Sequence, residues 1–304
     1  MQVDAILSDY DGTLCPTTSI NSKEDAIPKE IENILWHISE IIPVCIISSK
    51  DFDFLHRRTR YANITSCIMG IETLVLQRHK VMTDLSAHSE VGKADRALEC
   101  QNLGCIKESY LRDQNGILQY NSNLLYQLAE LVRENFDEIR IEEKFTVTGK
   151  KALAGITLDW RDVKDWKLFR TNSEPQLKKM IIQKQKELDS KRPNIYIQNY
   201  STHPFIDLYS TICDKGMAYD QIISMIPVVE KRRCNVIYLG DSENDNPGFR
   251  KATVSIGIQS DTRLKPKLDC SYILHISKLS IFLKSLLANN LKFSPSLITI
   301  KAKK

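Results

Sequence analysis

The 304-residue sequence lacks the marks of a disulfide scaffold, a zinc protein or a membrane protein. Its eight cysteines form no C-x-x-C pair and show no Cys/His spacing typical of zinc sites. Cys45 lies inside the apolar run IIPVCII, which predicts buried free thiols in a reducing compartment. No apolar run approaches the roughly 18 residues that a membrane helix needs. Internal repeats and low-complexity segments are also missing.

The sequence also carries little excess charge. Its net charge is +4, and hydrophobic residues make up 42% of it. This is the balance of an ordinary globular protein, and the weak positive charge suits a small phosphorylated metabolite better than nucleic acid. The segment MQVDAILSDYDG has no basic stretch followed by a long apolar one, so we expect no signal peptide and a cytoplasmic location. We expect no nucleic-acid or membrane partner, and no feature indicates the oligomeric state.

Short apolar runs alternate with helical patterns at both ends of the chain. The runs predict buried parallel strands at residues 3–9, 41–48, 62–70, 234–240 and 252–258. Helices are expected between them, over residues 27–41, 51–61, 214–226 and 243–251. This alternation predicts an α/β fold, a Rossmann-like, doubly wound parallel sheet with helices on both faces.

The middle of the chain has a different pattern. An amphipathic helix is expected over residues 121–136 and a charged helix over 176–191. Antiparallel strand pairs are expected within 144–160 and 194–210. These patterns predict an α+β unit at residues 81–208, inserted into a catalytic core formed by 1–80 and 209–304. The polar tail after Asn289 is expected to be loosely packed.

The first candidate site is Asp9-Tyr10-Asp11-Gly12-Thr13, directly after the first predicted strand. Side chains at i and i+2 of an extended chain face the same side, so the carboxylates of Asp9 and Asp11 are pushed together. Such a pair is costly unless a cation or a proton offsets the charge. Gly12 lets the backbone turn and expose N–H groups to an anion. On its own the pair could equally be a solvated turn.

Three further motifs end predicted strands or open predicted helices. Ser48-Ser49-Lys50 offers hydroxyl groups for phosphate oxygens, and Asp214-Lys215-Gly216 offers a point charge with room for close approach. The acidic segment from Gly240 to Asp245 offers the oxygen ligands that magnesium prefers. Each has a plain alternative taken alone, because serine and aspartate are common helix caps and lysine is common on surfaces.

In this order the four motifs resemble those of the haloacid dehalogenase (HAD) superfamily of phosphohydrolases. The superfamily pattern is DxDGT, a strand-terminal Ser or Thr, a Lys and GDxxND, which here read DYDGT, ISSK, DKG and GDSENDNP. The match covers the core at both ends of the chain. The resemblance implies a sheet with its site at the carboxyl ends of the strands, and an inserted α+β cap of the C2B type.

The resemblance also implies a role for each residue. Asp9 would attack phosphorus and form an aspartyl-phosphate, while Asp11 would act as general acid and base, as in phosphatases and phosphomutases rather than dehalogenases. The implied cofactor is Mg²⁺, held by Asp9, the Asp11 carbonyl, Asp241 and Asp245, with Asn244 behind them. The groups implied to bind phosphate are Gly12, Thr13, Ser48, Ser49 and Lys215.

The insert resembles the caps of the Cof-type and sugar-phosphatase branch, which includes sucrose-phosphate and trehalose-phosphate phosphatases. Glu142-Glu143-Lys144 and Asp159-Trp160-Arg161 are similar to the E-K…H-Y-R stretch of trehalose-phosphate phosphatases, with Asp-Trp in place of His-Tyr. Lys144 and Arg161 are therefore candidate substrate contacts, and a sugar phosphate is the expected substrate. Two alternatives stay open: a phosphomutase of the same fold, and a non-catalytic sugar-phosphate sensor.

Overall fold

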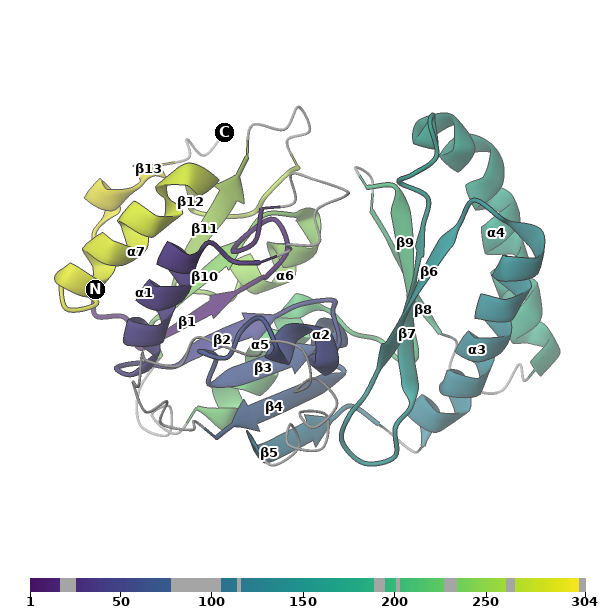
Figure 1. Ribbon diagram of the computed structural model, residues 1–304, viewed down its shortest axis with the longest axis horizontal. Helices are drawn as coiled ribbons and strands as arrows, with labels where there is room; N and C mark the ends of the chain where they lie inside the picture. The colour runs from purple at the N-terminus through teal and green to yellow at the C-terminus, as the bar shows by residue number, and fades with distance from the viewer. Residues whose placement is uncertain are drawn as a thin grey trace, which may run out of the picture.

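The computed structural model describes residues 1–16, 26–77, 105–113, 116–188, 195–200, 203–226, 234–260 and 266–300. Within these residues the strands form one nine-stranded sheet and one four-stranded sheet. Figure 1 shows the small sheet and its two helices standing next to the large sheet and its helices.

The large sheet has the strand order β13-β12-β11-β10-β1-β2-β3-β4-β5. Six consecutive strands are parallel: β12 (Tyr272–His275), β11 (Val254–Gln259), β10 (Val236–Gly240), β1 (Ala5–Ser8), β2 (Val44–Ile47) and β3 (Ile64–Cys67). Antiparallel strands complete both edges: β4 (Glu72–Leu76), β5 (Ile106–Leu111) and β13 (Thr299–Ile300). The five predicted parallel strands are confirmed as β1, β2, β3, β10 and β11.

Helices cover both faces of the large sheet. On one face α1 (Lys29–Ser39) and α7 (Leu279–Ala288) lie side by side and pack in one cluster with Ile6 (Figure 1). On the other face α5 (Lys215–Met225) packs with Ala5 and Leu7. Because both faces of β1 are buried, its sequence is apolar throughout rather than alternating.

Short helices complete the large-sheet domain. They are α2 (Phe52–His56), α6 (Asn246–Phe249) and the 3₁₀ turns η1 (Ile68–Gly70), η4 (Glu243–Asp245), η5 (Ile276–Lys278) and η6 (Pro295–Leu297). The expected helix over 243–251 is therefore split, since a 3₁₀ turn precedes the four residues of α6.

The small sheet is antiparallel, with the order β6-β7-β9-β8. Its strands are β6 (Arg140–Phe145), β7 (Leu153–Asp159), β8 (Tyr196–Asn199) and β9 (Phe205–Tyr209). Helices α3 (Ile117–Asn135) and α4 (Trp166–Leu188) pack on the face that carries Ile156 and Leu158. In Figure 1 these helices lie on the side away from the large sheet, so the other face of the small sheet is turned toward it. This is the α+β cap that the sequence predicts.

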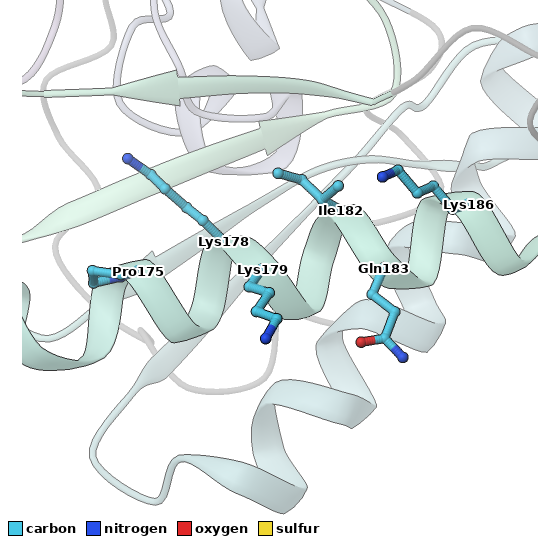
Figure 2. A pocket seen from close by; sticks show the side chains of 6 residues that line it. All are labelled: Pro175, Lys178, Lys179, Ile182, Gln183 and Lys186. Atoms are coloured by element: carbon cyan, nitrogen blue, oxygen red, sulfur yellow. The ribbon is translucent and has the colours of Figure 1, made fainter.

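Helix α4 begins at Trp166, well before the expected residue 176, and contains Pro175. Its sequence is rich in charged residues, which hides the apolar spacing that would mark its first turns. A hollow beside α4 is lined by residues of this helix, shown in Figure 2: Pro175, Lys178, Lys179, Ile182, Gln183 and Lys186. No predicted site residue lines it, so this hollow is not the candidate active site.

The division between core and cap follows the sheets. Strand β5 falls inside the expected cap range of 81–208, yet it pairs with β4 of the large sheet. We therefore propose that the cap spans residues 116–210, between β5 and the return of the chain to α5. Residues 78–104 lie outside the described ranges.

The expectation of a loosely packed tail after Asn289 is wrong for the described residues of that tail. Leu291 and Phe293 are buried, and the Phe293 N–H donates to the Met1 carbonyl at 2.8 Å. Strand β13 then pairs with β12. Leu291, Phe293 and Ile298 pack against the core, and the edge of β12 offers backbone partners to the residues that follow.

Among the described residues, polar contacts from Lys50, Asp51 and Glu72 join the core to the cap. Lys50 Nζ donates to both carboxylate oxygens of Glu142, at 2.8 and 2.9 Å. The buried Glu72 carboxylate accepts from the N–H groups of Val147 and Thr148, at 3.0 and 2.8 Å. Asp51 accepts more weakly from the N–H of Phe145, at 3.4 Å. The cap is thus held at the middle and the C-terminal end of strand β6 and at the turn that follows it.

The described cysteines are free, and all of them except Cys234 are buried, as predicted. Cys100 lies outside the described residues. No helix in the described ranges is both long and apolar enough to cross a membrane.

Candidate active site

The predicted motifs meet at the carboxyl ends of three central strands of the large sheet. Strand β1 lies between β10 and β2 and is parallel to both, so the residues that follow the three strands are neighbours. Asp9 follows β1, Ser48 follows β2 and Asp241 follows β10. Lys215 opens α5, whose first turn is capped by Asp214, which accepts from the Met217 N–H at 2.7 Å.

Lys215 stands between two carboxylates. Its Nζ lies 2.9 Å from Asp9 Oδ2 and 2.7 Å from Asp245 Oδ1, and all three side chains are buried. Asp241 adds a third carboxylate, and oxygens of the three aspartates lie within 4.8 Å of one another. Three carboxylates therefore share one ammonium group, which leaves the cluster negatively charged when all are ionised.

The Asp245 carboxylate is fully engaged by protein donors. Oδ1 accepts from Lys215 Nζ and from the Tyr238 hydroxyl, at 2.7 and 3.0 Å. Oδ2 accepts from the N–H groups of Asp241 and Ser242 and from the Ser242 hydroxyl, each at 3.1 Å. Five donors fill the acceptor capacity of a carboxylate. Asp245 therefore organises the loop and holds Lys215, with little capacity left for a further ligand.

The Asp241 carboxylate is held against the loop that carries Asp9. Oδ1 accepts from the Thr13 hydroxyl at 3.3 Å. Gly12 has φ +76°, and a Cβ at this position would overlap the Asp241 carboxylate. A glycine is thus required at residue 12 both by its backbone conformation and by the close approach of Asp241.

The pKa values of these groups reflect the excess of carboxylates. Burial raises the pKa of Asp9 to about 7, against the lowering effect of Lys215 and with a further rise from Asp245. Burial, Asp9 and Asp245 raise the pKa of Asp241 well above its usual range. Burial would lower the pKa of Lys215, but Asp245 and Asp9 outweigh it and raise the pKa. Lys215 stays charged because it has two partners, whereas each carboxylate shares one cation with its neighbours.

This arrangement fits a divalent cation. The free oxygens belong to Asp9 and Asp241, and hard oxygen ligands are those that Mg²⁺ prefers. A cation here would offset the repulsion that raises the pKa of both groups. Three of the four predicted metal ligands, Asp9, Asp241 and Asp245, are therefore brought together by their side chains, with Asp245 as the most engaged member. The fourth, the Asp11 carbonyl, stays a prediction.

Asp11 lies at the rim of the cluster. Its side chain is half-buried, and its charge acts on both Asp9 and Lys50. The loop is closed by the Gly12 N–H, which donates to the Cys15 carbonyl at 2.8 Å. Asp11 thus stands beside Asp9 but outside the ion cluster with Lys215.

The two serines after β2 differ in their surroundings. Ser48 is fully buried, and its hydroxyl accepts from the Lys50 N–H at 3.2 Å. Ser49 is half-buried. Asn244 lies in η4, and its Oδ1 accepts from the Ser242 hydroxyl. All the predicted core residues are therefore gathered around the end of β1.

Both predicted cap contacts are already paired within the cap. Lys144 is buried, with Nζ 3.1 Å from Asp207 Oδ1. Arg161 Nε lies 2.6 Å from Asp159 Oδ2, and the Arg161 side chain is 38% exposed. Each side chain therefore already has a carboxylate partner in the absence of substrate. Of the predicted contacts, only Arg161 keeps a substantial exposed surface.

Asp207, Tyr200 and Tyr238 are buried polar residues that the sequence motifs did not indicate. Asp207 is a single carboxylate inside the apolar strand FIDLY, and a lone buried charge in a strand is a usable signal for a polar cluster. The two tyrosines carried no such signal, because tyrosine is as common in strands and cores as at sites.

No protein-family model matches this chain, and no curated protein matches it either. Solved structures do match it over nearly its whole length. The C-terminal domain of trehalose-6-phosphate phosphatase from C. albicans has 15% identity and a TM-score of 0.63, with 94% of this chain and 92% of that chain covered. A haloacid dehalogenase-like hydrolase from Bacteroides thetaiotaomicron has 14% identity and a TM-score of 0.55, covering 94% and 100%.

A third match is a sugar phosphatase of HAD subclass IIB, with 13% identity and a TM-score of 0.52 over 95% of this chain and 100% of that one. This chain has the HAD fold. The HAD fold places a parallel core sheet and an inserted cap together, as the sequence predicts, and the end of β1 in this fold is where the Asp9 cluster lies.

Proposed function

We propose that this chain is a magnesium-dependent phosphohydrolase acting on a small phosphorylated metabolite, with a sugar phosphate as the substrate class. The observation that carries the proposal is the cluster of the buried Asp9, Lys215 and Asp245 with the half-buried Asp241 at the carboxyl end of β1. A cluster with more carboxylates than cations is expensive to bury, and such groups gather at functional sites.

Asp9 is the nucleophile in this proposal. A carboxylate oxygen of Asp9 attacks phosphorus, the bond from phosphorus to the leaving oxygen breaks, and an aspartyl-phosphate forms. Lys215 contacts Asp9 Oδ2 at 2.9 Å, so its ammonium orients the carboxylate and favours its ionised form. The same ammonium lies where negative charge on the transferred phosphoryl group would need a counter-charge.

Asp11 acts as the acid and base. In the first step its carboxyl group gives a proton to the leaving oxygen. In the second step a water attacks phosphorus, Asp11 accepts the proton of that water, and the bond from phosphorus to Asp9 breaks. The position of Asp11 at the rim, close enough for its charge to act on Asp9, supports this division of work.

Asp9, Asp241 and the loop organised by Asp245 would hold the Mg²⁺ ion. When bound, the ion supplies positive charge that keeps Asp9 ionised near neutral pH and lessens its repulsion of the phosphate. Gly12 and Thr13 serve this site by keeping the Asp241 carboxylate close to the Asp9 loop. Ser48 and Ser49 remain the proposed phosphate-binding hydroxyls beside it.

Two observations support a sugar phosphate. The similar structures include a trehalose-6-phosphate phosphatase and a sugar phosphatase. The cap face turned toward the core also carries polar groups, among them Glu142, Thr157 and Asp207. Such a face suits a ligand rich in hydroxyl groups better than an apolar one.

The direct test is a screen of phosphorylated metabolites with the purified chain and MgCl₂, reading released inorganic phosphate. Asp9→Asn should lose turnover, whereas Asp220→Asn, which changes an exposed carboxylate paired with Lys251, should keep it. Release of phosphate that survives Asp9→Asn would refute the covalent scheme. Formation of an isomeric phosphate without free phosphate would identify a phosphomutase, and binding without turnover would identify a sensor.

A further inference from the structure

Lys50 completes the ISSK motif but has no part in the proposed reaction. It follows Ser48 and Ser49 at the carboxyl end of β2, beside the strand that presents Asp9. Its Nζ donates to both carboxylate oxygens of Glu142, at 2.8 and 2.9 Å, and Glu142 belongs to β6 of the cap. The ion pair therefore joins the cap to the same strand ends that carry the candidate active site.

The core fixes the backbone of Lys50. The Lys50 N–H donates to the Ser48 hydroxyl at 3.2 Å, and the Lys50 carbonyl accepts from the Ile68 N–H at 2.9 Å. The next N–H, of Met69, donates to the Ser48 carbonyl at 2.9 Å. Ile68 and Met69 have φ of +51° and +56°, in the left-handed region that a β-branched residue rarely adopts. Strained backbone of this kind gathers at functional sites, and here it holds the residues that present the Lys50 ammonium.

Both partners of the pair are charged near neutral pH. Burial would lower the pKa of Lys50, but Glu142 and Asp11 outweigh it and raise the pKa. Burial would raise the pKa of Glu142, but Lys144 and Lys50 outweigh it and lower the pKa. The two side chains remain 21% and 34% exposed, so water can solvate both charges as soon as the pair separates. Ion pairs with this access to water cost little to break.

The contact at Glu72 has the opposite character. The Glu72 carboxylate is fully buried and accepts from the N–H groups of Val147 and Thr148, at 3.0 and 2.8 Å. The Thr148 hydroxyl donates to it as well, at 2.6 Å. Separation would leave a buried carboxylate without these donors, which is costly. Both donors lie in the turn between β6 and β7, at the end of the small sheet where β9 ends at Tyr209 and the chain returns to α5. The cap is therefore held firmly near its connection to the core and weakly farther along β6.

We propose that the Lys50–Glu142 ion pair is a latch that keeps the cap closed, and that the Glu72 contact is the pivot about which the cap opens. The bond from the Phe145 N–H to Asp51 lies between the two along the chain and is long, at 3.4 Å, so it breaks together with the latch. Opening moves the cap away from the end of β2 and gives a small metabolite access to the strand ends. The latch acts before any chemical step, so it is separate from the proposed reaction.

Glu143 provides a matched comparison. Successive side chains of a strand face opposite sides, so Glu143 is turned away from Lys50. Its Oε1 accepts from Arg133 Nη2, in the cap, at 2.7 Å, and its side chain is 26% exposed. Glu142→Gln and Glu143→Gln therefore remove the same charge from neighbouring positions of β6. They differ in whether the cation that loses its partner belongs to the core or to the cap.

The experiment measures hydrogen exchange of single backbone N–H groups in the full chain by NMR, at low ionic strength and without substrate. Glu142→Gln should raise the exchange rate of the Phe145 N–H about fivefold, because the open state becomes more populated. The N–H groups of Val147 and Thr148 should keep their wild-type rates, since the pivot still holds them. Glu143→Gln should leave all three rates unchanged.

Salt provides a second measurement that a merely structural role would not affect. About 0.5 M KCl should raise the Phe145 exchange rate of the wild type, since it screens a partly exposed ion pair, but not that of Glu142→Gln. The double variant Lys50→Glu/Glu142→Lys forms the pair in reverse and should restore the slow rate.

A wild-type exchange rate of Phe145 in Glu142→Gln would overturn the latch, and so would the same increase in Glu143→Gln. Faster exchange at Val147 and Thr148 as well would overturn the pivot, because the pair would then support the fold of the cap as a whole. Glu142→Gln keeps the shape of the side chain, so it tests the latch even if a lysine variant does not fold. Failure of the proposed function is seen separately, in the metabolite screen, because exchange is measured without substrate.

Discussion

The core and the cap each bury a lysine with an aspartate, and the two clusters differ in charge balance. In the cap, Lys144 and three hydroxyls serve one carboxylate, Asp207. In the core, Lys215 serves Asp9 and Asp245, with Asp241 close by. The first cluster is satisfied by the chain itself. The second has more carboxylates than cations, and an excess of this kind is found more often at functional sites than in structural ion pairs.

The pKa values follow this difference. Burial would raise the pKa of Asp207, but Lys144, Thr157 and Tyr200 outweigh it, and the pKa is lowered. Burial raises the pKa of Asp9 to about 7 in spite of Lys215, and the nearby carboxylates of Asp245 and Asp11 raise it further. The pKa values of two aspartates with the same kind of partner are therefore shifted in opposite directions. Substitutions of these two aspartates should accordingly have opposite effects on the stability of the fold.

The largest effect is expected from Asp9→Asn. Loss of the nucleophile should lower kcat by at least about 1,000-fold. Tm should stay constant or rise, because the substitution removes one of the crowded carboxylates and leaves Lys215 paired with Asp245. Phosphate release and thermal melting check both parts. The matched change in the cap, Asp207→Asn, should lower Tm clearly, since it weakens the partner of the buried Lys144.

The second-largest effect is expected when the buried lysine of each cluster, Lys215 or Lys144, is replaced by methionine. Lys215→Met should destabilise the cation-free protein by about 3–5 kcal/mol, since it leaves carboxylates buried without a partner. Excess Mg²⁺ should restore part of this loss. Lys144→Met should cost only about 1–3 kcal/mol, because three hydroxyls still donate to Asp207. Urea unfolding with EDTA and with MgCl₂ measures both values, and Mg²⁺ rescue of Lys144→Met would contradict the comparison.

The pH dependence of stability should separate the clusters with a moderate effect. The lowered pKa of Asp207 stabilises the fold above the unfolded pKa of about 4, and this stabilisation is lost as the pH falls through the folded pKa. The raised pKa of Asp9 does the reverse: in EDTA, stability is lost as the pH rises from about 4 through about 7. Urea unfolding across pH gives the free energy of unfolding as a function of pH. Asp207→Asn should reduce its pH dependence on the acid side, and Asp9→Asn should reduce it between about pH 4 and about pH 7.

The smallest effect is expected from Thr13→Val. The hydroxyl of Thr13 donates to Asp241 at 3.3 Å, a long hydrogen bond worth about 1 kcal/mol. Its loss should raise the half-saturating Mg²⁺ concentration about fivefold with little change in Tm. Thr59→Val is the control, because the Thr59 hydroxyl is equally buried but donates to the Leu55 carbonyl, away from the site. An equal change in Mg²⁺ dependence in both variants would remove the role given to Thr13.

The sequence by itself determined the centre of the molecule. Strands buried on both faces, such as β1 and β10, read as continuous apolar runs, so the parallel sheet was predictable. The motif residues directly follow these strands. Because parallel strands end at one edge, the meeting of Asp9 with Asp241 followed from topology alone.

Only the tertiary structure decided what surrounds that centre. The edge strands β4 and β5, and the docked segment around Phe293, depend on partners distant in sequence and leave no strong local pattern. The cap cations expected to meet a substrate, Lys144 and Arg161, turned out to be paired with Asp207 and Asp159. A sequence shows which residues can be charged, whereas charge balance depends on which groups are brought together, and this distinguishes the Asp9 cluster from the Asp207 cluster.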